Sequence, residues 1–168
     1  MKIYPSALRP LRGLHAELVG ARTLEDRFDA EGDVSGGSRP GYDVCFYGPL
    51  GEVHIDTKAL VALSPSEKRN YPGCSWKMAR DRHQLFDQAA VGYIVLVALD
   101  AAPARVVVRP TSVDISLPLT GAPVYVVPVG DMNEQLSPVE AAQEKWRYVI
   151  FDDGWLEGFR HQPGTTTS

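Results

Sequence analysis

The sequence of 168 residues predicts a mixed α/β fold of the α+β type, in which helices flank a central mixed sheet. Three stretches carry this prediction. Residues 8–29 repeat apolar side chains every three or four positions, as an amphipathic helix does. Residues 41–58 have the pattern of two short strands joined by a tight turn. Residues 93–99 form an unbroken apolar run of strand length, which indicates a strand buried on both faces.

The predicted first helix presents one apolar stripe to the core. The stripe is expected to consist of Leu11, Leu14, Leu18, Ala21, Leu24 and Phe28. Glu17 and Glu25 border the stripe, so each fits either an inward position near a site or an ordinary place on the helix surface. Residues 29–41, which follow, are rich in Gly, Ser and Asp and predict a loop with a brief strand at Val34. Arg39 in this loop fits a phosphate contact or a plain connector.

The predicted hairpin separates its side chains onto two faces, because successive strand residues point in opposite directions. One face is expected to carry Val53, Ile55 and Thr57, and the other His54, Asp56 and Lys58. Asp43, at the start of the first strand, brings a second carboxylate toward Asp56 and Lys58. Mg²⁺ is usually held by one or two carboxylates, and a lysine beside such a site can orient or deprotonate a water. The same charges also fit the solvated face of a surface hairpin.

The region after the hairpin is predicted to be helical and positively charged. Residues 64–67 have the pattern of a turn or a helix start, and residues 75–90 predict a second helix with Ser75 as its N-cap. Between residues 68 and 83 the charged residues are Lys68, Arg69, Lys77, Arg80 and Arg82, with Asp81 as the single acidic one. This patch fits contacts with phosphates or the solvated face of a helix.

The C-terminal part predicts further strands at residues 105–109, 113–117 and 124–129. The sequence Ser137-Pro138-Val139-Glu140 is a capping box, which predicts a helix from there to about residue 146. Residues 148–151 are expected to pack on the sheet. The chain is thus predicted to form one domain over residues 1–160, followed by a disordered tail at 161–168.

Composition narrows the classes of function. The formal net charge of −4 argues against a protein that coats nucleic acid non-specifically. Neither a membrane-length apolar run nor a positively charged start followed by an apolar stretch is found, which predicts a cytoplasmic protein with no membrane contact. The two cysteines, Cys45 and Cys74, lack metal-ligand spacing and are expected to be free thiols, so zinc is not expected.

The order of these segments, together with the short acidic motif, resembles the PD-(D/E)xK nuclease superfamily, whose fold is called restriction-endonuclease-like. In that family a helix with a glutamate precedes a strand that bears an aspartate. A neighbouring strand carries an acidic-x-Lys triplet, and a helix and a buried strand follow. The matching positions here are Glu17, Asp43 and Asp56-Thr57-Lys58, and the resemblance covers roughly residues 11–100.

The resemblance implies an endonuclease that hydrolyses DNA phosphodiester bonds with bound Mg²⁺, or with Mn²⁺ in its place. Asp43, Asp56, Glu17 and the main-chain carbonyl of Thr57 would hold the metal, and Lys58 would orient the attacking water. The residues implied to contact DNA are Lys77, Arg80, Arg82, Gln84 and Arg39. The resemblance also allows a homodimer.

A second function stays open, because a nuclease fold also serves in proteins without catalytic activity. It is a catalytically silent module that binds nucleic acid or protein, or assembles with itself. The segment from Phe151 to Trp155 is a candidate surface for a protein partner.

Overall fold

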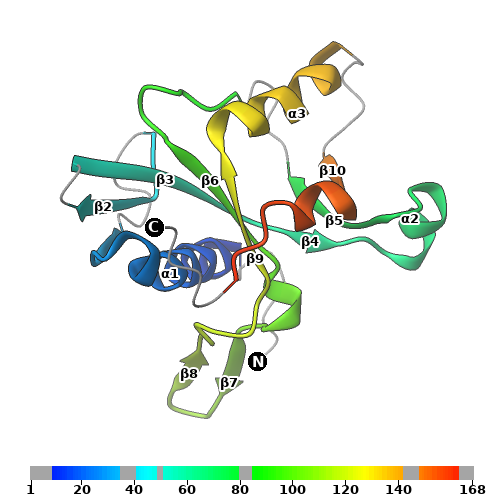
Figure 1. Cartoon of the computed structure of the whole chain (residues 1–168). Coiled ribbons are helices and arrows are strands. Elements are labelled where there is room, and N and C mark those ends of the chain that lie inside the picture. The colour runs from blue at the N-terminus through cyan, green and yellow to red at the C-terminus, as the bar shows by residue number, and fades with distance from the viewer. Residues whose placement is uncertain (1–8, 35–40, 49–50, 80–84, 142–147, 163–168) are drawn as a thin grey trace.

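The computed structural model describes residues 9–34, 41–48, 51–79, 85–141 and 148–162. Its centre is a mixed five-stranded sheet with the strand order β1-β2-β3-β6-β9 (Figure 1). The strands are β1 (Gly32–Val34), β2 (Val44–Gly48), β3 (Gly51–Ala59), β6 (Tyr93–Val97) and β9 (Val124–Pro128). β3 runs parallel to β6, and the other neighbours in this sheet pair antiparallel. The α+β fold class, the hairpin and the buried apolar strand are confirmed.

Helix α1 (Arg9–Phe28) covers one face of this sheet, and its bounds agree with the prediction to within a residue or so at each end. Its buried side differs from the predicted stripe, because Leu14 is 40% exposed whereas Ala16 and Val19 are buried. The helix turns its small residues to the sheet. A Cβ placed at Gly20 would lie only 3.3 Å from Cγ1 of Val95 on β6, so this side of the helix approaches the strands closely.

A second layer covers the opposite face of the sheet. It consists of α3 (Val129–Ala141), α4 (Asp153–Glu157) and a three-stranded sheet in the order β10-β5-β4. Its strands are β4 (Val61–Ala62), β5 (Cys74–Ala79) and β10 (Tyr148–Asp152). Side chains such as Met78, Met132 and Phe151 form one buried cluster with Leu96 of β6, whereas the adjacent Val95 belongs to the α1 cluster. β6 is therefore buried on both faces, as its sequence predicted.

The predicted helix over residues 75–90 is wrong. Its first part is strand β5, which pairs antiparallel with β4 on one edge and with β10 on the other. Trp76 and Met78, two residues apart, both contact the buried cluster of the second layer, as the two-residue period of a strand requires. The partner strand β10 lies some 70 residues away in the sequence, and this long-range pairing overrides the local helical pattern.

The remaining segments follow the prediction more closely. The helix start expected at residues 64–67 is present as α2 (Pro65–Asn70), and Ser64 caps it through a capping box with Glu67. β7 (Arg105–Val108) and β8 (Val113–Ser116) form a separate hairpin that projects from the body of the molecule, and the 3₁₀ helix η2 (Leu99–Ala101) precedes it (Figure 1). The predicted helix start at the capping box of residues 137–140 is wrong. Helix α3 begins eight residues before Ser137, directly at the end of β9, so Ser137 lies inside the helix and does not cap it.

Residues 161 and 162 of the predicted tail lie within the described part of the chain. The backbone N–H of His161 donates to the carbonyl of Val124 at 2.8 Å, so the start of the predicted tail is tied to the sheet. Residues 163–168 of that tail lie outside the described residues. Among the helices that are described, none has both the length and the apolar character needed to cross a membrane.

Candidate active site at the sheet fork

The site lies where β3 extends beyond the part of the strand that pairs with β2. The two strands pair as far as Val44 opposite Ile55, and β3 then continues through Ala59 with β6 on its other edge. We call this edge of residues 56–59, together with Asp43, the sheet fork. Asp43 closes the fork, since its N–H donates to the carbonyl of Ile55 at 2.8 Å and its Oδ2 accepts from the N–H of Thr57 at 2.8 Å.

The backbone of Thr57 presents both of its polar groups to the fork. The N–H and C=O of one strand residue point to the same edge of the strand. Because the N–H of Thr57 reaches Asp43, its carbonyl oxygen also faces the fork. The side chain of Thr57 points to the opposite face, under α1, and its Oγ1 is buried without a hydrogen-bond partner in the described part of the chain.

The three residues that the hairpin pattern singled out do meet. Lys58 Nζ forms an ion pair with Oδ1 of Asp56, and it lies 3.9 Å from Oδ2 of Asp43. The side chains are 28% exposed for Lys58, 21% for Asp43 and 13% for Asp56, so the cluster is largely shielded but open to solvent at the lysine. A partly buried cluster of this kind differs from the solvated face of a surface hairpin.

The electrostatics of the fork favour a proton or a cation between the two aspartates. Burial raises the pKa of Asp56 to about 7, with further contributions from its hydrogen bond to Asp43 and from the charge of Asp43. Lys58 acts in the opposite direction and lowers this pKa in part. Two carboxylates in contact cannot both ionise without cost, so they hold positive charge between them.

Glu17 of α1 is the third acidic group of the site. Its pKa is raised, first by burial and then by the charge of Asp43, while Lys58 lowers it. Its Oε2 is buried and has no hydrogen-bond partner among the described residues. Glu25, the alternative from the sequence, instead pairs with Arg22 at 2.5 Å on the helix surface. The helix therefore directs Glu17, and not Glu25, toward the fork.

The fork offers a set of oxygen atoms that fits a hard divalent cation. The candidate ligands are the carboxylates of Asp43, Asp56 and Glu17 and the carbonyl of Thr57. Mg²⁺ and Mn²⁺ prefer such oxygen ligands over nitrogen or sulfur. A bound cation would favour the ionised form of Asp56, whose pKa is raised, and of Glu17, whose Oε2 has no hydrogen-bond partner within the described segments.

Of the residues predicted to contact DNA, the structure describes only Lys77, which lies outside the fork. Lys77 is on β5 and only 12% exposed, and its Nζ pairs with Glu67 at 2.5 Å and lies 4.5 Å from the ring centroid of Tyr148. The other four, Arg39, Arg80, Arg82 and Gln84, fall outside the described residues. The fork thus contains the predicted catalytic and metal-binding residues, and Lys77 is held in a separate ion pair.

The aromatic segment considered as a partner surface has a local explanation. The Trp155 ring stacks on Phe151 with centroids 5.8 Å apart and meets Phe159 at 4.9 Å. Trp155 and Phe159 both pack against the buried cluster of the second layer. Local packing therefore accounts for these side chains.

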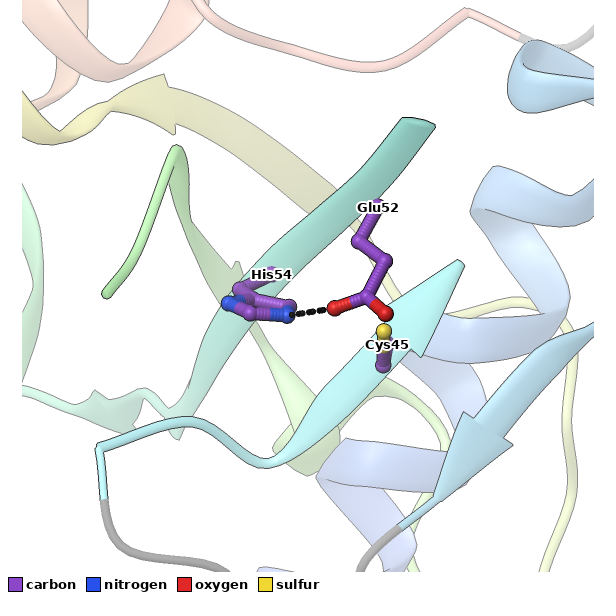
Figure 2. Close-up of side chains that lie close together, drawn as sticks. All are labelled: Cys45, Glu52 and His54. Carbon is purple, nitrogen blue, oxygen red and sulfur yellow. Dashed lines mark hydrogen bonds and ion pairs between the residues drawn. The ribbon is translucent and has the colours of Figure 1, made fainter. Parts of the chain in front are cut away.

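A second polar cluster, which the sequence analysis missed, lies on the same hairpin. Cys45, Glu52 and His54 bring a thiol, a carboxylate and an imidazole together, with the three reactive atoms within 4.8 Å of one another (Figure 2). The signal was present in the hairpin register, which places Cys45 opposite His54, and in the alternation that puts Glu52 on the face of His54.

Comparison of the chain with models of known protein families, with curated proteins and with solved structures finds no match.

Proposed function

We propose that this protein is a metal-dependent endonuclease that hydrolyses DNA phosphodiester bonds at the sheet fork. The observation that carries the proposal is the convergence of Asp43, Asp56, Lys58 and Glu17, which come from three segments of the chain, at one partly shielded place. These are the residues that the resemblance to PD-(D/E)xK nucleases marks as functional. The choice of DNA as substrate rests on that resemblance.

The residues at the fork would hold Mg²⁺, with Mn²⁺ as a substitute. Asp43, Asp56 and Glu17 would contribute carboxylate oxygens, and Thr57 its carbonyl oxygen. The bound metal supplies positive charge that stabilises the charge building on the scissile phosphate in the transition state. Such a cation would compete with the ammonium group of Lys58 for the carboxylate of Asp56.

Lys58 is placed where it could orient the attacking water. It stands at the most exposed side of the cluster, where a substrate phosphate would arrive. A protonated lysine donates hydrogen bonds, so it would orient the water and stabilise the developing oxygen charge. Asp43 would also keep the fork in shape, because its carboxylate ties the N–H of Thr57 to the start of β2.

The test compares DNA cleavage by the wild type with Asp56→Asn, Lys58→Met and the surface control Asp114→Asn. Supercoiled, linear, single-stranded and branched DNA are each incubated with Mg²⁺, Mn²⁺ or EDTA. We expect cleavage that needs the metal and falls by roughly 10²–10³-fold or more in the two fork variants. The control substitution lies on the exposed strand β8 and should leave cleavage unchanged.

Two outcomes would decide against the proposal. Metal-dependent cleavage of normal rate by Asp56→Asn would place the chemistry elsewhere. A folded wild type that binds Mg²⁺ but cuts none of the DNA forms would instead favour the catalytically silent module.

A further inference from the structure

We propose that Cys45, Glu52 and His54 form a binding site for Zn²⁺, separate from the cation site at the fork. The three side chains share one face of the β2–β3 hairpin (Figure 2). Cys45 and His54 are direct cross-strand partners, and Glu52 precedes His54 by two residues. The zinc site does not depend on the proposed nuclease function.

The imidazole of His54 is held as a metal ligand usually is. Its Nδ1 lies 2.8 Å from the carbonyl oxygen of Ala90, and a carbonyl only accepts, so Nδ1 carries the proton. Metal-binding histidines commonly donate their second ring N–H to a backbone carbonyl in this manner. The ring of Tyr42 stacks on the imidazole with centroids 4.0 Å apart and fixes its plane.

The other ring nitrogen then points into the cluster. His54 Nε2 lies 3.0 Å from Oε2 of Glu52. A neutral imidazole with its proton on Nδ1 offers only a lone pair there, and an ionised carboxylate also offers only lone pairs. Two acceptors at this distance need a positive species between them, either an additional proton or a metal cation.

The thiol of Cys45 favours a transition metal over a proton, because it adds a third ligand atom within 4.8 Å of the other two. Its side chain is fully buried, and it lies beneath a half-buried histidine and a glutamate side chain that is 57% exposed. A thiol so placed cannot reach a substrate as a nucleophile, but it can serve as the inner ligand of an ion that enters past Glu52. Thiolate, imidazole and carboxylate are the ligands that Zn²⁺ takes, and Mg²⁺ does not take a thiolate.

The position of this site links it to the fork. His54 and Asp56 lie on one face of β3, roughly 7 Å apart along the strand. A zinc ion shared by Cys45 and His54 would join β2 to β3 beside the point where Asp43 closes the fork. With three protein ligands and an exposed side, the fourth position would be left to a water or another small ligand.

Zinc binding is tested by equilibrium dialysis with an excess of Mg²⁺ present, together with absorption spectra of the Co²⁺-substituted protein. We expect one Zn²⁺ per chain and a cobalt spectrum with tetrahedral bands and a thiolate charge-transfer band. Cys45→Ser should abolish that band, and Cys45→Ser and His54→Gln should each weaken zinc binding by about 100-fold or more. Cys74→Ser, which changes the other cysteine, and Asp56→Asn, which changes the fork, should leave zinc binding intact.

X-ray absorption at the zinc edge of the wild type adds a measurement that needs no variant. A sulfur neighbour at about 2.3 Å and an imidazole nitrogen at about 2.0 Å are expected. Failure to bind zinc, or a shell of oxygen atoms alone, would overturn the proposal. Zinc binding that is lost in Asp56→Asn and kept in Cys45→Ser would assign the ion to the fork and overturn it as well.

Discussion

Replacing Asp56 by asparagine is expected to stabilise the metal-free protein at pH 8. Asparagine keeps the shape of the side chain and removes a charge that the fork disfavours. The carboxyl of Asp56 is largely buried beside Asp43, which raises its pKa to about 7. The amide can still hydrogen bond to Asp43, as the protonated acid does.

The direction and size of the effect follow from proton linkage. The pKa of Asp56 is near 3.8 in the unfolded chain and about 7 in the folded protein. Protonated Asp56 contributes favourably to the free energy of unfolding; this contribution is fully present below pH 3.8 and is lost as the pH rises through 7. A difference of about 3 pKa units corresponds to about 4 kcal/mol at most, since each unit is worth 1.36 kcal/mol. Because Lys58 opposes part of the rise in the pKa of Asp56, we expect a gain of about 2–4 kcal/mol.

The assay is urea unfolding in EDTA between pH 4 and pH 8. The free energy of unfolding of the wild type should fall with rising pH relative to Asp56→Asn, so the two curves should converge near pH 4. The control Asp114→Asn removes an exposed carboxylate that pairs with Arg109, and we expect a change within about 0.5 kcal/mol at every pH.

Several results would refute this reasoning. A variant that is no more stable than the wild type at pH 8 would show that the fork tolerates the ionised carboxylate. Parallel pH curves would show that Asp56 titrates normally. Addition of Mg²⁺ provides a further check, because it should stabilise the wild type by mass action and stabilise the variant less.

Three further predictions concern other residues. Lys58→Met removes a cation that competes for the aspartates, so the Mg²⁺ affinity measured by calorimetry should rise about three- to tenfold, and weaker binding would contradict this. Gly20→Leu should lower the free energy of unfolding in urea by about 1–3 kcal/mol, because the new side chain crowds the sheet. Gly13→Ala, at a position with open space, should raise the free energy of unfolding by about 0.5–1 kcal/mol. Equal effects of the two substitutions would refute the close packing at Gly20. Ser64→Ala should cost about 1 kcal/mol by thermal unfolding through loss of the α2 cap, and Ser66→Ala clearly less.

The proposed active site was partly readable in the sequence. Strand alternation predicted that Asp56 and Lys58 would share a face, and the hairpin brought Asp43 to them. The choice between Glu17 and Glu25 was not readable, because both border the same helix stripe. The rotation of α1 about its axis decides it, and that rotation depends on how the small residues around Gly20 fit against β6.

The Cys45 cluster shows a different limit. Sequence rules for metal sites depend on the spacing between cysteines along the chain, and Cys45 and Cys74 do not have the spacing of metal ligands. The partners of Cys45 are instead a glutamate and a histidine on the neighbouring strand, so the cluster appears only when the register of the hairpin is known.

The sequence by itself determined the parts of this protein that depend on local periodicity, namely α1, the β2–β3 hairpin and the doubly buried β6. Tertiary structure alone decided that residues 74–79 are a strand, because β10 supplies its hydrogen bonds from far along the chain. The same pairing brings Tyr148 of β10 beside Lys77. Side-chain periodicity is a local property, whereas strand pairing depends on which distant segment arrives alongside.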